Sequence, residues 1–448
     1  MATYLTRTPN SSGSNTTWTF SCWYKKTSIG LDTVPFATGY TSPQIDEAMI
    51  NIGADDQLRF NIAINDVTDV TVKSARKLRD TSGFYHIVVA CDTTQATASD
   101  RIKIYFNGEL ETNLSNTDYP TQNQSTFFGD TNKTQEIGRQ PRSSNYLFGV
   151  MSHVHFIDGT AYQASDFGQY DANGVWKIKT SPSVTYGTNG FFILKDGGSV
   201  TDQSGNGNNW TVSGGTLTDT LDCSANVFAT WNSLSGSASN TYSNGNTTVS
   251  YPNNFQRNAN GTLAFNSGKY YGEFKRTGAA NLHIGIVGNT FLEDGRIITD
   301  TGESHTYNMR GHTGCVTLIT NTGDQSIFVD GSDSSTDVDF FTSAGDIVMV
   351  AFDADTKKIW FGKNGTWSSS GNPATGANPS YTYSGTATSD FTFGADTENG
   401  SSCNANFGNG YFGTTAVASA GTNASGNGIF EYDVPTGYTA LSTKGLNL

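Results

Sequence analysis

The sequence predicts an all-β protein that consists of two tandem antiparallel β-sandwiches. Two stretches far apart in the chain follow one plan, in which two strands are separated by a polar crossing and followed by an Asn-Gly turn. They run from Phe84 to Leu110 and from Gly345 to Trp367. The chain has 448 residues, which is too long for one ordinary sandwich and suits two of about 200 residues each. The repeated plan and the length therefore both indicate two sandwiches.

The strands of the first stretch follow from local patterns. Residues 87–90 form a β-branched apolar run that is long enough for a strand and too short for a helix. Residues 102–106 alternate between apolar and polar side chains, which is typical of a half-buried strand. Asn107 and Gly108 predict a tight turn, because both residues accept positive φ angles. The second stretch repeats this plan, with strands at 347–352 and 358–362 and a turn at Asn364-Gly365.

Other strands of the first half carry large apolar side chains. Trp18, Phe20, Cys22 and Tyr24 alternate along the chain and therefore share one face of a strand. Burying one large aromatic side chain contributes roughly 2–3 kcal/mol, so we expect this strand in the centre of a sheet. Further strands are predicted at 49–53, 58–64 and 146–159.

Composition limits the classes of partner. Aromatic residues make up 12% of the chain and there are 50 glycines, so we expect a folded chain with many turns rather than a disordered one. The net charge is −14 and no basic stripe is visible, which argues against nucleic acid or an anionic membrane as partner. The five cysteines lack metal spacing. Because the start has no apolar signal core and no run could span a membrane, we expect synthesis in a cytoplasm.

Several segments of the first half carry a family resemblance. They are Phe20–Lys26, Tyr85–Val89, Ile104–Gly108 and Gly149–Gly159. On these segments, residues 1–160 resemble a laminin-G/concanavalin-A-like jelly roll. A D-x-S-G-N-G-N element that normally opens such a domain follows at 202–211, so the jelly roll is circularly permuted or the segment belongs to a linker. We favour permutation and a domain over 1–215, because the preceding residues 191–194 are too apolar to leave in water.

A second resemblance begins after a junction. Residues 216–245 are rich in Ser, Asn, Thr and Gly and predict a linker that Phe228 and Trp231 partly order. The segments that carry the second resemblance are Ser267–Phe274, His283–Val287, Gly345–Asp353, Lys358–Gly365, Asn406–Gly408 and Tyr432–Leu441. On these, residues 246–448 are similar to a SPRY domain, a β-sandwich that presents binding loops at one end. Residues 414–428 depart from this family as a Gly/Ala/Ser/Asn insertion, which predicts a surface loop.

The combination of both domains resembles virion structural proteins of tailed phages. The resemblance implies a non-enzymatic protein on the virion surface that is made in the host cytoplasm and contacts other virion proteins. We expect a homo-oligomeric adhesin at a tail fibre or a tail-appended position that binds host-surface polysaccharide. A capsid decoration or head-fibre protein is the alternative, and a polysaccharide-degrading enzyme is the third hypothesis.

Sugar binding is the favoured chemistry, because aromatic rings stack on sugar rings and polar side chains bond to hydroxyls. Aromatic residues in a β-sandwich are mostly core, so a packing role is the alternative for each candidate. The candidate ligand contacts are Trp210, Tyr307, Trp367, Tyr381 and Tyr383.

Calcium is the candidate cofactor, because laminin-G and related jelly rolls hold this hard cation with Asp, Asn and backbone oxygens. The candidate ligands are Asp158, Asp202, Asn206 and Asn208. The alternative is that the segment from Asp202 forms a turn closed by hydrogen bonds from backbone to side chain.

No catalytic residue is predicted. Glycosidases of the concanavalin-like superfamily carry an E-x-D-x-x-E strand, because retaining hydrolysis needs two carboxyl groups. The nearest stretch places Glu431 and Asp433 correctly but has Thr436 at the last position. His153 and His155 alternate on one strand and could bind a metal jointly. A packed or solvent-facing pair is favoured, because no third ligand is near.

Overall fold

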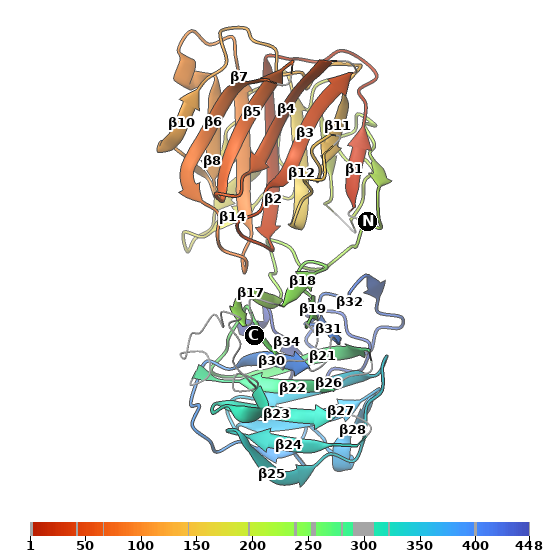
Figure 1. Cartoon of the computed structure of the whole chain (residues 1–448). Helices are drawn as coiled ribbons and strands as arrows, with labels where there is room; N and C mark the ends of the chain where they lie inside the picture. The colour runs from red at the N-terminus through yellow and green to blue at the C-terminus, as the bar shows by residue number, and fades with distance from the viewer. Residues whose placement is uncertain are drawn as a thin grey trace. The chain divides into compact units, whose positions relative to one another are not determined.

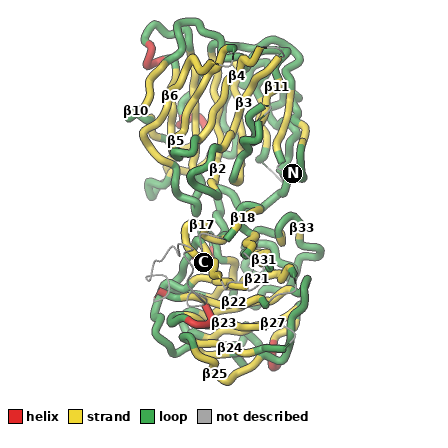
Figure 2. The backbone as a smooth tube through the Cα atoms, in the orientation of Figure 1, coloured by secondary structure: helices red, strands yellow, loops and turns green. Residues whose placement is uncertain are grey.

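The computed structural model confirms an all-β protein, with 46% of residues in strands and 4% in helices. It describes residues 3–41, 44–65, 67–141, 143–195, 198–236, 240–251, 257–278, 281–289, 309–320, 323–397 and 401–447. Strands and loops dominate the backbone throughout (Figure 2). Nowhere in these ranges is there a helix with both the length and the apolar character to cross a membrane.

The chain divides into two compact units. Unit 1 comprises residues 1–219 and 223–225, and unit 2 comprises residues 220–222 and 226–448. Most of the predicted linker over 216–245 lies in unit 2, which includes residues 220–222 and 226–245. Phe228 and Trp231 are buried there, at 1% and 0% exposure. Trp231 packs edge-on against Phe407 at 5.1 Å between ring centroids.

Two antiparallel sheets form unit 1 (Figure 1). The larger has the order β10-β6-β5-β4-β3-β11-β1-β16 and the smaller the order β15-β12-β2-β7-β8-β9. Strand β2 lies inside the smaller sheet, as its aromatic face predicted. The bounds are β1 (Tyr4–Arg7), β2 (Thr17–Lys26), β3 (Thr33–Thr41), β4 (Gln44–Ile52), β5 (Gln57–Ile64), β6 (Val67–Lys77), β7 (Tyr85–Asp92), β8 (Ile102–Phe106), β9 (Glu109–Leu110), β10 (Leu114–Asp118), β11 (Thr134–Ile137), β12 (Gly149–Asp158), β15 (Phe191–Ile193) and β16 (Thr211–Ser213).

The core of unit 1 lies between these sheets. Trp18 of the smaller sheet contacts Phe60 of the larger at 5.4 Å between ring centroids, and Phe20 stacks on Phe36 at 5.0 Å. The whole predicted face of β2 belongs to this buried cluster. β15 pairs with β12, and β16 pairs with β1. The D-x-S-G-N-G-N segment between β15 and β16 thus joins two strands that complete the two sheets.

A short layer covers the outer face of the smaller sheet. It contains α1 (Ala164–Phe167) and the hairpin of β13 (Gly168–Tyr170) and β14 (Trp176–Ile178). Its apolar residues pack on Val88, Ala90 and Tyr105. The Asn107-Gly108 turn lies under this layer, with φ angles of 48° and 89°. A Cβ atom at Gly108 would lie 2.6 Å from the Trp176 ring. Glycine is therefore needed here both for the positive φ angle and for the close contact with this ring.

Unit 2 is a second pair of sheets, which are antiparallel apart from the short parallel pairing of β34 with β21. One has the order β17-β20-β30-β22-β23-β24-β25, and the other has the order β18-β19-β31-β21-β26-β27-β28, with β29 and β34 attached. The bounds are β17 (Trp231–Gly236), β18 (Thr241–Ser243), β19 (Thr248–Ser250), β20 (Arg257–Gly261), β21 (Lys269–Thr277), β22 (Leu282–Val287), β23 (Cys315–Thr320), β24 (Ser326–Val329), β25 (Ser332–Asp337), β26 (Ile347–Asp353), β27 (Lys358–Lys363), β28 (Thr366–Trp367), β29 (Tyr381–Thr382), β30 (Thr392–Thr397), β31 (Ser402–Asn406), β32 (Tyr411–Phe412), β33 (Thr415–Ala416) and β34 (Thr439–Ala440).

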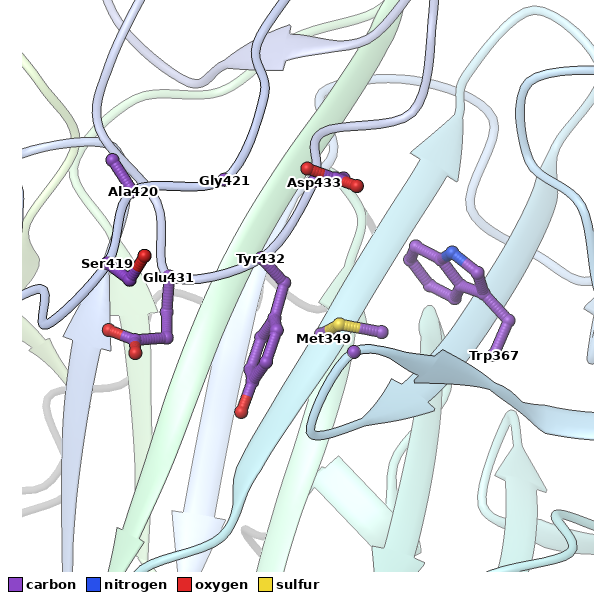
Figure 3. A pocket seen from close by; sticks show the side chains of 9 residues that line it. Met349, Trp367, Ser419, Ala420, Gly421, Glu431, Tyr432 and Asp433 are labelled. Carbon is purple, nitrogen blue, oxygen red and sulfur yellow. The ribbon is translucent and has the colours of Figure 1, made fainter.

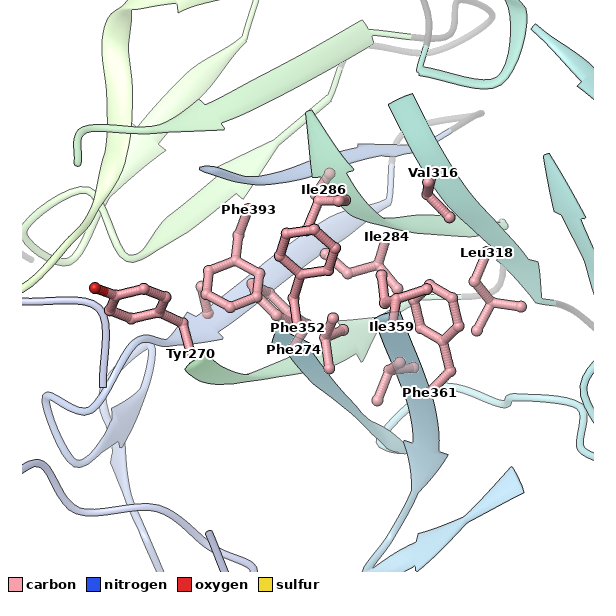
Figure 4. Packing of buried hydrophobic residues seen from close by; sticks show 14 of the residues in the cluster. Tyr270, Phe274, Ile284, Ile286, Val316, Leu318, Phe352, Ile359, Phe361 and Phe393 are labelled. Carbon is pink, nitrogen blue, oxygen red and sulfur yellow. The ribbon is translucent and has the colours of Figure 1, made fainter. Parts of the chain in front are cut away.

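The core of unit 2 again lies between two sheets (Figure 4). Phe274 on β21 faces Phe393 on β30 at 5.5 Å between ring centroids. The outer face of β21, β26 and β27 is also apolar. The segment after β33 covers it, and Phe430 packs edge-on against Tyr271 at 4.9 Å. This covering segment positions the candidate site.

Candidate functional site

A cavity of about 580 Å³ opens on unit 2 beside the covering segment (Figure 3). Its walls come from strand β26 (Met349), from strand β28 (Trp367), from residues 419–421 of the insertion and from residues 431–433. Figure 3 shows Tyr432 between Glu431 and Trp367, with Met349 on the side towards Trp367. The cavity therefore combines two aromatic rings with two carboxylates.

The turn between β27 and β28 shapes one side of the cavity. Asn364 and Gly365 have φ angles of 48° and 88°, as the Asn-Gly pair predicted. A Cβ atom at Gly365 would lie 3.0 Å from the Tyr432 ring. Glycine therefore lets the Tyr432 ring lie directly against the turn, and Trp367 follows two residues later on β28.

The insertion forms the opposite side, and the two carboxylates hold it there. The Ala418 N–H donates to Glu431 Oε2 at 2.8 Å. The N–H and the hydroxyl of Thr422 donate to Asp433 Oδ1 at 2.6 and 2.8 Å. The hydrogen bonds from Thr422 keep the pKa of Asp433 below its usual value, so this carboxyl is ionised at neutral pH. The expected surface loop is also a wall of the cavity.

Glu273 fixes the covering segment from below. This side chain on β21 is fully buried. The backbone N–H groups of Glu431 and Tyr432 each donate to it at 2.8 Å, to Oε2 and Oε1. The Tyr271 hydroxyl and the Asn406 amide donate to the same carboxyl group at 2.9 and 3.3 Å. Burial raises the pKa of Glu273 to about 7, and these hydrogen bonds oppose that shift.

The two rings of the cavity are only half-buried. Trp367 packs edge-on against Tyr271 at 6.2 Å between ring centroids. Burial raises the pKa of the Tyr432 hydroxyl, and the charges of Glu431, Glu273 and Asp346 add to that shift. Both rings thus keep accessible surface in a region of negative potential.

The other predicted sugar contacts lie elsewhere. Trp210 and Tyr383 are buried at 4% and 3% exposure. Trp210 packs edge-on against Phe191 at 4.9 Å, and the Tyr383 hydroxyl donates to Asp330 at 2.9 Å. Tyr381 is half-buried against the core of unit 2, and Tyr307 lies outside the described residues. Burial therefore favours the packing alternative for Trp210 and Tyr383, and Trp367 alone of the four described candidates lines the cavity.

The predicted calcium ligands do come together in unit 1, around residues 187–190. Asp202 Oδ1 accepts the Phe192 and Ser204 N–H groups at 2.8 and 2.9 Å, and Oδ2 accepts the Asn208 N–H at 2.8 Å. Asp158 accepts the N–H groups of Ser14 and Asn189 at 2.7 and 2.9 Å. The amide nitrogens of Asn206 and Asn208 both donate to the Gly190 carbonyl, at 3.0 and 2.8 Å.

This cluster already contains a cation. The Arg7 guanidinium donates to the Asn208 side-chain oxygen at 2.6 Å and to the Asn189 carbonyl at 3.0 Å. Burial lowers the pKa of Arg7 to about 10, while the charges of Asp202 and Asp158 raise it. Backbone N–H groups thus bond to the carboxylate oxygens of both Asp158 and Asp202, as the alternative of a turn closed by hydrogen bonds predicts. Calcium binding by these residues stays a prediction, and Arg7 supplies a positive charge beside the two carboxylates.

The histidine pair is also structural. His153 has a φ angle of 49° and lies in a bulge of β12. His155 is buried, stacks on Phe192 at 4.0 Å between ring centroids and bonds to the Tyr186 hydroxyl through Nδ1 at 2.9 Å. Burial lowers the pKa of His155 well below its usual value, so the ring is neutral. Within the described ranges, no group of three or more His, Cys, Asp or Glu could hold a metal ion.

Comparison with known proteins identifies the class of the first domain. Residues 2–165 match the family model Laminin_G_3 of the concanavalin A-like lectin/glucanases superfamily. Residues 2–165 thus have a concanavalin-A-like fold, and the sheet order shows two antiparallel sandwiches in tandem. No curated protein matches the chain.

Three solved structures show partial similarity. The SPRY domain of human HERC1 has 14% identity and a TM-score of 0.26, covering 35% of this chain and 86% of its own. The TRIM65 PSpry domain has 11% identity and a TM-score of 0.29, covering 40% and 88%. The native heptameric SAP-like pentraxin from Limulus polyphemus has 16% identity and a TM-score of 0.26, covering 36% and 71%. SPRY domains are thus among the structural neighbours.

Proposed function

We propose that the chain is a non-enzymatic structural protein of a tailed-phage virion, and that it binds host-surface glycan through the cavity of unit 2. In this proposal it is displayed at a tail fibre or a tail-appended position. The observation that carries the binding function is the pair of half-buried rings, Trp367 and Tyr432, beside the carboxylates of Glu431 and Asp433. Aromatic faces with adjacent hydrogen-bond acceptors suit sugar rings and their hydroxyl groups.

The state of the carboxylates supports binding rather than cleavage. Glycoside hydrolysis by paired carboxyl groups needs one of them to carry a proton to the leaving oxygen. Hydrogen bonds from Thr422 lower the pKa of Asp433, so this group is poorly suited to donate a proton. One oxygen of Glu431 accepts the Ala418 N–H, which gives that carboxylate a role in holding the wall of the cavity.

A single open site of this kind binds one glycan weakly, so the proposal includes display in several copies. Linked binding sites raise avidity by about 10²–10⁴-fold over a single site. A homo-oligomer that docks on other virion proteins provides such display. It also requires a surface for docking that differs from the cavity.

The test measures retention of the full chain on immobilised polysaccharide from the host, with Trp367→Ala as the variant. We expect about five- to tenfold weaker retention, because loss of a stacking ring costs about 1–1.5 kcal/mol. The matched control is Phe341→Ala, since Phe341 is an exposed aromatic of unit 2, at 47% exposure, outside the cavity. Equal retention of wild type and both variants would contradict a role of the cavity.

Two further measurements address the alternatives. Immunogold labelling of intact particles separates tail from head, and labelling of the head would replace the adhesin proposal by the decoration hypothesis. Release of reducing sugar from the same polysaccharide by purified protein would show an enzyme instead. We expect labelling at the tail and no release of sugar.

A further inference from the structure

We infer that the cavity of unit 2 selects glycans that carry a free ammonium group, such as amino sugars without an N-acetyl group. This inference rests on the proposed function and specifies its substrate class. It follows from the charge of the cavity, from the carboxylate oxygens that bond to no protein group among the described residues, and from the aromatic faces of the cavity.

The charge of the cavity is negative. Its nine lining residues include Glu431 and Asp433 and no Lys, Arg or His. The Tyr432 hydroxyl also experiences the charge of Asp346. Lys363 on the adjacent strand β27 donates its Nζ proton to the Phe341 carbonyl at 3.0 Å and is not part of the lining. A cationic ligand therefore enters a field that no lining base offsets.

Each carboxylate uses one oxygen for the protein. Glu431 Oε2 accepts the Ala418 N–H, and Asp433 Oδ1 accepts both donors of Thr422. Among the described residues, no hydrogen bond is made to Glu431 Oε1 or Asp433 Oδ2. Hydrogen bonds between an ammonium group and a carboxylate are roughly twice as strong as neutral ones. The two remaining oxygens thus suit a charged donor better than a sugar hydroxyl.

The aromatic faces add a second attraction for a cation. An ammonium group within about 6 Å of a Trp or Tyr ring is attracted by the ring quadrupole. Trp367 and Tyr432 both line the cavity and are both half-buried. A ring that bears an ammonium group can stack on one of them while the charge reaches a carboxylate.

The size of the cavity favours a sugar over a lysine side chain of a protein partner. Its volume of about 580 Å³ lies within the range of roughly 300–1,000 Å³ for small-molecule sites. A linear lysine side chain would leave much of this space unfilled. Sugar rings fill it and supply hydroxyl donors for the rest of the lining.

The experiment titrates the full chain with two probes of equal length, hexaglucosamine and its fully N-acetylated counterpart. The titration is made at low salt near pH 6, where ordinary carboxyl groups are ionised. We expect hexaglucosamine to bind about tenfold more tightly, and we expect the preference to fall as salt is added. Glu431→Gln and Asp433→Asn together should abolish the preference, because they remove both negative charges. Both amides keep an oxygen for the bonds to the insertion, so the wall of the cavity is retained.

The control variant is Asp337→Asn, which removes an exposed carboxylate of unit 2 outside the cavity lining. Equal binding of both probes, or no binding of hexaglucosamine, overturns the inference. Tighter binding of hexalysine than of hexaglucosamine, lost in the double variant, also overturns it in favour of a basic peptide. The proposed function falls separately, only if intact host polysaccharide does not bind.

Discussion

Replacing Glu273 by Gln tests whether the buried carboxyl beneath the cavity weakens the fold at alkaline pH. Burial raises the pKa of Glu273 from 4.5 to about 7. The folded state therefore holds the proton more tightly than the unfolded state. The stability that Glu273 contributes is fully present below about pH 4.5 and is lost as the pH rises through about 7.

The magnitude follows from the shift of the pKa. A shift from 4.5 to about 7, at about 1.4 kcal/mol per pKa unit, corresponds to about 3 kcal/mol. The amide of the Glu273→Gln variant cannot titrate, so the difference in unfolding free energy between wild type and variant should shrink by about this amount between pH 4.5 and 8. The variant is less stable at acid pH, because its amide group faces N–H donors that the carboxyl oxygens accepted.

The free cysteines provide the assay. Cys22 and Cys91 are buried in unit 1, and Cys315 and Cys403 are buried in unit 2. Thiol labelling of the full chain in graded urea, read by mass spectrometry, gives an unfolding free energy for each unit. Cys403 reports the effect, and Cys22 serves as the internal reference.

A matched control is Glu109→Gln, which makes the same chemical change at an exposed position of unit 1. It should leave the pH dependence of unit 2 unchanged. The reasoning would be refuted if the difference in unfolding free energy between wild type and Glu273→Gln stayed constant or grew towards pH 8. The four hydrogen bonds to the carboxylate would then outweigh its burial.

Three further predictions concern unit 1. Arg7→Met should lower the unfolding free energy of unit 1, measured by the labelling of Cys22, by about 2–3 kcal/mol, because it removes charged hydrogen bonds from the Asn208 cluster. Addition of EDTA should leave the stability of the wild type unchanged, and a loss of stability would reveal a bound metal. Trp210→Ala should cost about 3–5 kcal/mol in the same assay, as for other buried tryptophans, and a cost below about 1 kcal/mol would contradict its core position. Gly108→Ala should lower the unfolding free energy of unit 1 by about 1–3 kcal/mol, because of the positive φ angle and the nearby Trp176 ring. An unchanged midpoint of the urea transition would contradict that contact.

The strands and hairpins were predictable because their signals are local. The alternation of Trp18, Phe20, Cys22 and Tyr24 depends only on the period of two in a strand, and the structure places all four in one core. The two Asn-Gly turns likewise adopt the positive φ angles that their residue types favour. The boundary between the two units was less predictable. A Ser- and Gly-rich composition does not reveal that Trp231 packs against Phe407 and so belongs to unit 2.

The roles of single aromatic residues were not predictable from the sequence. Trp210 and Trp367 both lie next to turns in polar segments, yet one is buried and the other lines the cavity. The difference arises from partners far away in the chain. Phe36 and Phe191 enclose Trp210, whereas Trp367 lies on a two-residue strand at the edge of the cavity. Residue type sets what a ring can do, and tertiary neighbours set whether it is accessible.

The carboxylates show the same limit and also explain how the cavity depends on the fold. Glu431 and Asp433 were considered for catalysis by their spacing, but their actual partners are Ala418 and Thr422 of the insertion. Glu273, about 160 residues earlier, fixes the backbone at Glu431 and Tyr432.

A substitution at Glu273 should therefore change both the stability of unit 2 and glycan binding, because it moves the wall of the cavity. Glu431→Gln and Asp433→Asn should change the preference for charged sugars and leave stability nearly unaltered, since both keep their bonds to the insertion. Measuring both properties on these variants separates residues that shape the cavity from those that contact the ligand.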